Sequence, residues 1–250
     1  MSFRLSRAFF IWVLFPVYAA GMGRSPAEEY TLDPQTPAVV AIDPGHGGKN
    51  EGADVYGRKE REIVLAVAQR LQEILEERPA LSPYLTRWDD DFVALTDRVT
   101  RGEAVGGKVF VSLHVDNNRV RKGRGVITYV YGSNRTIPKG PERERDEKIL
   151  PKPPRGQIAQ SRRLAAHIQK SMRRHGINAV EYVDRGPFAV LKSAWMPSVI
   201  VELGNLRDKK EAAMVSDPRQ QARLAEAIAD SIEGYLRERY GGVAKRAGTD

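Results

Sequence analysis

Three short apolar runs, each ending at or just before a polar side chain, constrain the fold of this chain more than any other feature. The runs lie at 38–42, 109–114 and 198–203, and each is typical of a strand buried on both faces. His46 follows the first run in a glycine-rich turn, and His114 and Glu202 stand near the ends of the other two. Because ligands of open α/β sheets bind at the carboxyl ends of the strands, we expect these three side chains to share one site.

The segments between these runs alternate between helix-like and strand-like patterns. The clearest helix spans 59–77, where apolar residues recur at helical spacing. Further helices are predicted at 92–101, 157–175 and 219–240, and further strands at 84–86, 125–130 and 188–191. This order predicts an α/β fold: a single domain with a twisted, mostly parallel sheet of about six strands, flanked by helices on both faces.

The N-terminus has the pattern of a secretory signal peptide. Arg4 and Arg7 precede an apolar run at 8–20, and small residues follow it. We therefore divide the chain into a signal peptide at 1–21, a linker at 22–37, a catalytic domain at 38–240 and a tail at 241–250. An uncleaved anchor is the alternative, although the run is short for a membrane span and contains Pro16. The interpretation predicts export to the periplasm or cell wall, with no stable membrane span after cleavage.

Composition narrows the chemistry of the chain. The net charge of +8 favours anionic partners, which include cell-wall polymers, membrane surfaces and nucleic acids. The chain has no cysteine, which excludes disulfides, thiol catalysis and zinc bound by cysteine. A metal site in this chain must use histidines and carboxylates.

Residues 132–156 interrupt the α/β pattern. The segment is highly charged and contains five prolines, and it is longer than most connections in a compact domain. We interpret it as a solvated loop, and a lid or regulatory segment over the site is the alternative.

Glu60 is the fourth candidate for the site, because it begins the helix that follows the His46 loop. Two histidines and one carboxylate form a common catalytic zinc set, and a carboxylate that does not bind the metal can act as a general base. Glu202 has the position for that role. The alternatives are a buried histidine with an ordinary hydrogen-bond partner and a glutamate that only stabilises the helix dipole. We interpret His167 and His175, which lie on a predicted helix, as surface residues.

Four segments carry a family resemblance over about 39–236: AIDPGHGGKNEGA, GRKEREIVL, VFVSLHVDNN and PSVIVELGNLRDKKEAAMV. They resemble the zinc-dependent N-acetylmuramoyl-L-alanine amidases, in their amidase-3 catalytic domain. The resemblance implies that His46, Glu60 and His114 bind Zn2+ and that Glu202 is the catalytic base. It implies hydrolysis of the peptidoglycan amide bond between N-acetylmuramic acid and L-alanine, with peptidoglycan and not nucleic acid as the partner.

The chain also departs from the family pattern. Gly204-Asn205 stands where the family commonly has Gly-Phe, and Val115-Asp116 stands where it often has Ala-Asn or Ala-Asp. Lys192 is a weak candidate for substrate binding, with an ordinary surface charge as the alternative. Some family members carry an autoinhibitory helix where residues 132–156 fall, so an activator protein acting on this segment is a further expectation. Two other functions stay open: a catalytically inactive wall-binding or regulatory module, and a zinc peptidase that cleaves stem peptides.

Overall fold

The computed structural model describes residues 32–133 and 150–241. The predicted signal peptide, most of the predicted linker, nearly all of the tail and residues 134–149 of the predicted insertion lie outside the described residues. Within the described part, no helix has both the length and the apolar character that crossing a bilayer requires.

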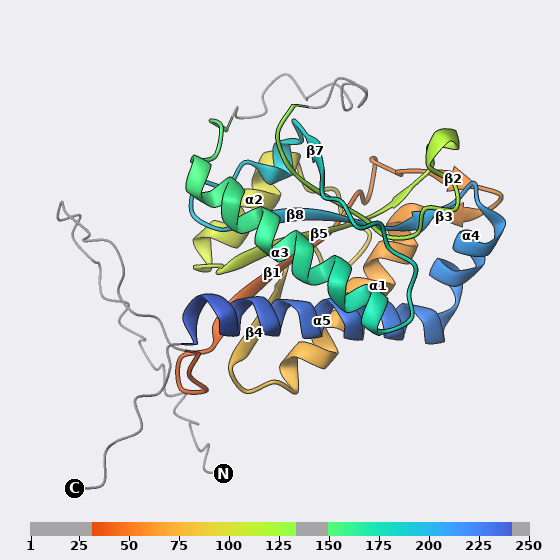
Figure 1. Cartoon of the computed structure of the whole chain (residues 1–250). Coiled ribbons are helices and arrows are strands. Elements are labelled where there is room, and N and C mark those ends of the chain that lie inside the picture. The colour runs from red at the N-terminus through yellow and green to blue at the C-terminus, as the bar shows by residue number, and fades with distance from the viewer. Residues whose placement is uncertain (1–31, 134–149, 242–250) are drawn as a thin grey trace, which may run out of the picture. The chain divides into compact units, whose positions relative to one another are not determined.

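A six-stranded sheet forms the centre of the domain (Figure 1). The first four strands across it are parallel, and the next strand, β6, is antiparallel to its neighbour β8. The prediction of a mostly parallel sheet of about six strands is therefore confirmed. In spatial order the strands are β4 (Leu81–Leu85), β1 (Ala38–Pro44), β5 (Val109–Asp116), β8 (Ser198–Asn205), β6 (Ile127–Tyr131) and β7 (Asp184–Gly186).

Helices cover both faces of the sheet. On one face α1 and α3 pack against the strands and α5 packs against both helices, and Figure 1 shows α3 sloping down towards α5. On the other face α2 packs against the short 3-10 helix η2. The bounds are α1 (Glu60–Glu76), α2 (Leu95–Ala104), α3 (Arg155–Arg174), η2 (Ala189–Leu191), α4 (Lys209–Ser216) and α5 (Pro218–Tyr240).

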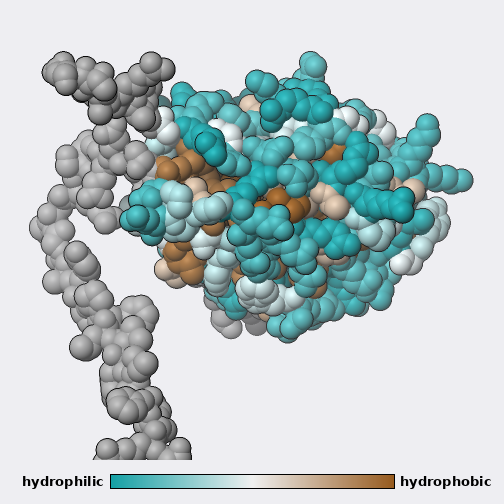
Figure 2. Space-filling view, turned by 90° about the horizontal axis from the view of Figure 1, so that it is seen from below, coloured by the Kyte–Doolittle hydropathy of each residue, from teal (hydrophilic) through white to brown (hydrophobic). Residues whose placement is uncertain are grey.

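Successive side chains of the central strands supply both halves of the core. Ala41, Phe110 and Ile200 belong to a buried cluster with Val99 of α2 and Leu191 of η2. Their neighbours along the strands point to the opposite face, because successive side chains of a strand alternate between faces. This explains why the strands read as continuous apolar runs in the sequence. On the outside, the side seen in Figure 2 is mainly hydrophilic, with apolar side chains confined to small patches between polar ones.

One local prediction is wrong, and two others have shifted bounds. Residues 188–191 were predicted to form a strand, but Ala189–Leu191 form η2, and the neighbouring strand β7 occupies Asp184–Gly186 instead. The physical reason is that all three residues of η2 are buried by packing on the face of the sheet that α2 covers. Their side chains are therefore apolar although the residues do not form a strand of the sheet. The strand at 84–86 and the helix at 92–101 exist with shifted bounds, as β4 and α2.

One helix was missed. α4 begins after Asp208, whose side chain accepts hydrogen bonds from the backbone N–H groups of Lys210 and Glu211. Asp217 caps α5 in the same way, directly before Pro218 at the first helical position. The sequence contained the signal, since Asp208 with a glutamate three residues later resembles a capping box. Residues 206–208 form the turn between β8 and α4, directly beyond the strand that carries Glu202.

Candidate metal centre

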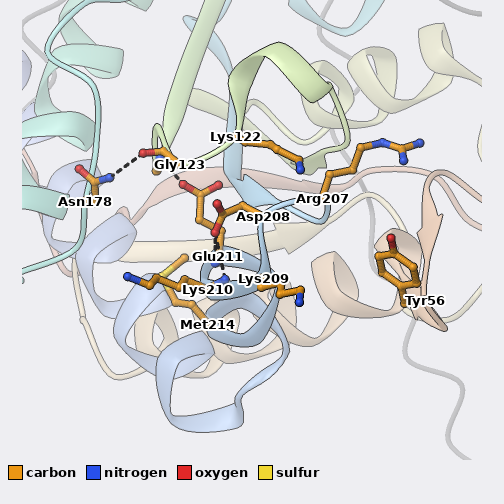
Figure 3. Close-up of a pocket in the computed structure, with 11 residues that line it drawn as sticks. Tyr56, Lys122, Gly123, Asn178, Arg207, Asp208, Lys209, Lys210, Glu211 and Met214 are labelled. Carbon is orange, nitrogen blue, oxygen red and sulfur yellow. Dashed lines mark hydrogen bonds between the residues drawn. The ribbon is translucent and has the colours of Figure 1, made fainter.

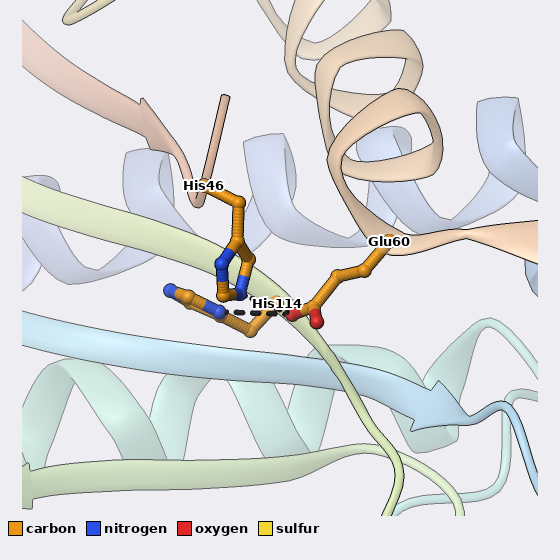
Figure 4. A group of neighbouring side chains, drawn as sticks. All are labelled: His46, Glu60 and His114. Carbon is orange, nitrogen blue, oxygen red and sulfur yellow. Dashed lines mark hydrogen bonds and ion pairs between the residues drawn. The ribbon is translucent and has the colours of Figure 1, made fainter. Parts of the chain in front are cut away.

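His46, Glu60 and His114 meet at the carboxyl edge of the sheet (Figure 4). Glu60 Oε1 lies 3.0 Å from His46 Nε2 and 3.0 Å from His114 Nδ1. One candidate ligand atom from each residue can be chosen so that all lie within 4.8 Å of one another. The two imidazole rings meet edge to face, with centroids 4.8 Å apart. The structure thus brings together three of the residues that the sequence predicted to share a site.

Backbone geometry brings His46 to His114. The N–H of Gly45 donates to the carbonyl of Leu113, which continues the pairing of β1 with β5 beyond the end of β1. His46 itself has a φ of 60°, an uncommon conformation for a residue other than glycine. A Cβ on residue 45 would lie 2.4 Å from Cε1 of His114, so the ring occupies space that only glycine leaves open.

Glu60 reaches the histidines as the first residue of α1. A two-stranded hairpin, β2 (Asp54–Val55) with β3 (Arg58–Lys59), turns the chain back from the His46 loop to the helix. The N–H of Ala53 donates to Glu60 Oε2, and the N–H of Val115 donates to Oε1. These bonds fix a carboxylate that is only 5% exposed.

The charges of the group stabilise one another. Burial acts to raise the pKa of Glu60, but hydrogen bonds and charge from His114 and His46 hold that pKa well below its usual range. Burial acts to lower the pKa of His46, and the contact with Glu60 outweighs it, so the pKa is raised. Asn50 Oδ1 lies 2.9 Å from His46 Nδ1. Because an amide oxygen only accepts hydrogen bonds, Nδ1 carries the proton of the neutral ring, and the unprotonated Nε2 faces Glu60. Partners of this kind orient histidines that bind metals.

Glu202 lies on the strand next to His114. The two residues are paired in register between β5 and β8. Among the described residues, Glu202 Oε2 is buried and has no hydrogen-bond partner. Burial, and then the negative charges of Glu60 and Asp116, raise the pKa of Glu202 well above its usual value, while Arg121 opposes them. A buried carboxyl group with an unused oxygen beside a candidate metal group has the properties of a general acid–base residue.

Two buried arginines support the His46 loop, and the sequence interpretation missed both. Arg98 is 1% exposed and donates to the carbonyls of Pro44 and His46, and Arg87 is 2% exposed and donates to those of Pro44 and Gly45. Burial, and then repulsion from Arg98, lower the pKa of Arg87 to about 10. Asp43 could have indicated these arginines from the sequence, because a carboxylate at the end of a buried apolar strand requires a buried partner of opposite charge.

The donor set fits a catalytic zinc ion. Two imidazole nitrogens and one carboxylate oxygen suit zinc, and a set of three protein ligands leaves a position for substrate or water. Glu60 Oε1 contacts both histidines, so the three side chains already converge on a small volume. His46 and His114 each expose 20% of their side chains, which leaves the group accessible from solvent.

Comparison with known proteins identifies the family. A family model described as N-acetylmuramoyl-L-alanine amidase (Amidase_3) matches residues 40–234. The chain belongs to this amidase family. The Bacillus subtilis (strain 168) protein YqiI is 32% identical over 201 residues, which cover 79% of this chain and 84% of that protein. AmiA of Escherichia coli (strain K12), an N-acetylmuramoyl-L-alanine amidase, is 30% identical over 221 residues, which cover 79% of this chain and 76% of AmiA.

Solved amidase structures agree with the fold. The catalytic domain of CwlV from Bacillus (Paenibacillus) polymyxa var. colistinus matches with a TM-score of 0.64 and 31% identity, covering 80% of this chain and 98% of that domain. AmiC of Escherichia coli O6:H1 is 26% identical over 221 residues, but the match covers only 53% of that protein. The match with this longer relative therefore spans about half of its length.

The remaining candidates of this amidase lie elsewhere. Lys192 donates to the carbonyl of Leu150, and it is absent from the candidate metal group. His167 lies on α3 and His175 caps its C-terminal end, and they contact Glu238 and Asp230 of α5. Both are partly buried rather than fully at the surface, with side chains 27% and 25% exposed, and neither joins the metal group.

Proposed function

We propose that this amidase uses Zn2+ held by His46, Glu60 and His114 to hydrolyse the amide bond between N-acetylmuramic acid and the L-alanine of the stem peptide. The observation that carries the proposal is the contact of one Glu60 oxygen with both histidines, beside the unpartnered carboxyl oxygen of Glu202. Zinc in such a site lowers the pKa of water and polarises a carbonyl group.

The chain's own residues perform the proton transfers in this proposal. Ionised Glu202 accepts a proton from the attacking water, and the protonated carboxyl then gives it to the nitrogen that leaves with the peptide. The raised pKa of Glu202 favours the second step, because a more basic carboxylate holds the proton until the C–N bond breaks. Asn50, Arg87 and Arg98 hold the His46 loop and side chain in place during both steps.

Location and regulation belong to the proposal as well. One relative is named as a probable cell wall amidase, LytH of Staphylococcus aureus. We therefore keep export to the periplasm or cell wall through a signal peptide at 1–21 as a prediction. An activator protein that acts on residues 132–156 also stays a prediction.

Digestion of purified peptidoglycan tests the function. The protein, with zinc and then with a chelator, is incubated with insoluble wall, and the products are analysed by mass spectrometry. We expect new free L-alanine amino termini, intact glycan chains, and loss of both signals with the chelator. Cleavage inside the stem peptide would favour the peptidase alternative, and no cleavage with zinc present would favour the inactive module.

A further inference from the structure

A pocket of about 830 Å³ lies beside the turn that follows β8 (Figure 3). The proposed reaction does not use it. Its lining combines a cationic rim, one aromatic residue and two carboxyl groups. The residues that line it include Tyr56, Lys122, Arg207, Lys209, Lys210 and Glu211.

The loops around the pocket are the ones that carry the candidate metal group. Tyr56 belongs to the hairpin between His46 and Glu60. Lys122 follows β5, the strand of His114, and Arg207 follows β8, the strand of Glu202. Two hydrogen bonds join the latter loops: Arg207 Nε donates to Asn117 O over 2.7 Å, and Leu206 N donates to Asp116 O over 2.8 Å. The pocket therefore opens at the same edge of the sheet as the metal group.

The rim of the pocket is cationic. It contains the side chains of Lys122, Arg207, Lys209 and Lys210. Among the residues that the structure describes, none of the three lysines forms an ion pair. Asp208 also lines the pocket, but its Oδ1 caps α4 through the N–H groups of Lys210 and Glu211. Positive charge therefore exceeds negative charge around the opening.

Glu211 adds a buried polar group to this pocket. It is 8% exposed, and its Oε1 accepts a 2.6 Å hydrogen bond from the N–H of Gly125. Its Oε2 has no hydrogen-bond partner among the described residues. Burial, and then the charge of Asp208, raise the pKa of Glu211, while the hydrogen bond from the N–H of Gly125 opposes them. The four cationic side chains that line the pocket outnumber its two carboxyl groups, so the pocket suits a ligand that carries negative charge.

We propose that this pocket binds the carboxylates of the stem peptide while the amide bond at its N-terminal alanine lies at the metal group. The inference rests on the proposed function and extends it to substrate recognition. The stem peptide bears free carboxylates within a few residues of the scissile bond, whereas the glycan on the other side is built of neutral sugars. An extended peptide spans roughly 3.3 Å per residue, so a stem peptide of several residues extends well beyond the metal group and can bring its carboxylates to the loops that follow β5 and β8.

Matched substrates and charge reversals test the kinetic consequence. A soluble muramyl peptide with free carboxylates is compared with the same compound carrying carboxamides, for the wild type, Lys122→Glu/Lys209→Glu and the control Lys170→Glu on the exposed surface of α3. We expect the double variant to raise KM about tenfold for the carboxylate substrate only, with kcat nearly unchanged, because two charge contacts become repulsions. Lys170→Glu should behave like the wild type. The proposal would be overturned if the double variant had the same KM as the wild type for the carboxylate substrate and for the carboxamide substrate.

Direct binding separates this inference from the proposed function. The free stem peptide is titrated into the zinc-loaded wild type and into the double variant by calorimetry, which requires no turnover. Binding by the wild type that weakens about tenfold in the double variant supports the pocket even if the wild type cleaves no peptidoglycan. Absence of binding at millimolar peptide, or equal binding by both proteins, overturns it even if the amidase is active. Arg207 is not altered, because it also holds the carbonyl of Asn117.

Discussion

Arg98 and Asp43 form a fully buried ion pair beneath the candidate metal centre. Arg98 Nη1 lies 2.9 Å from Asp43 Oδ1, and neither side chain is more than 1% exposed. Thr86 and Ser112 donate to the two oxygens of the same carboxylate. The guanidinium also donates to the His46 carbonyl, so this pair connects the sheet core to the left-handed turn that presents a candidate metal ligand.

Removal of Arg98 should destabilise the fold. In Arg98→Met the carboxylate of Asp43 stays buried without its counter-charge, and such changes cost about 3–5 kcal/mol. The free energy of unfolding, measured by urea titration, checks this value. Arg162→Met, an exposed residue on α3, is the control and should change it by less than about 0.5 kcal/mol. If the two variants are equally stable, the pair has no structural role.

The same ion pair predicts a dependence of stability on pH. Burial alone would raise the pKa of Asp43, but Arg98 and the hydrogen bonds outweigh it, so the folded-state pKa lies below its usual value. Stability from this group is therefore complete above the unfolded pKa of about 3.9 and is lost as pH falls through the folded pKa. Unfolding measured between about pH 6 and pH 3 should show a smaller decrease for Asp43→Asn than for the wild type. Parallel curves would contradict the prediction.

Gly45 should be irreplaceable for a steric reason. A Cβ there would lie 2.4 Å from His114 Cε1 and 2.8 Å from the carbonyl of Leu113. Gly45→Ala should therefore displace the His114 ring, weaken zinc binding and lower stability by about 1–3 kcal/mol. Gly156→Ala is the matched control, because a Cβ there meets nothing within 4 Å and the residue lies in α3. Zinc titration by calorimetry compares the two, and equal affinities would show that the ring accommodates the methyl group.

Glu202→Gln should separate metal binding from turnover. The amide has nearly the same shape but neither accepts nor returns a proton, so turnover should decrease by roughly 10²–10⁴. Zinc stoichiometry, measured by atomic emission, should stay at the wild-type value, because Glu202 is not a member of the His46, Glu60 and His114 group. His114→Ala serves as the contrasting variant and should lose the metal. Wild-type turnover in Glu202→Gln would remove this residue from the reaction.

Much of the architecture could be predicted because it rests on local patterns. The three apolar runs form the central strands β1, β5 and β8, and the 3.6-residue stripes form α1, α3 and α5. The convergence of His46, Glu60 and His114 also followed from sequence, since each stands at the end of an element and parallel strands end at one edge. The apolar run at 188–191 misled the prediction, because burial on a sheet face and burial within a sheet produce the same composition.

Sequence alone thus determined which residues could form a metal group and which strands present them. Only the tertiary structure decided how that group is held and what surrounds it. Arg98 lies 52 residues along the chain from His46, whose carbonyl accepts its hydrogen bond, and Glu211 lies 86 residues from Gly125, whose N–H donates to it. The physical reason is that hydrophobic periodicity reports burial over a few residues, whereas the partner of a buried charge or amide depends on which distant segments the sheet brings together.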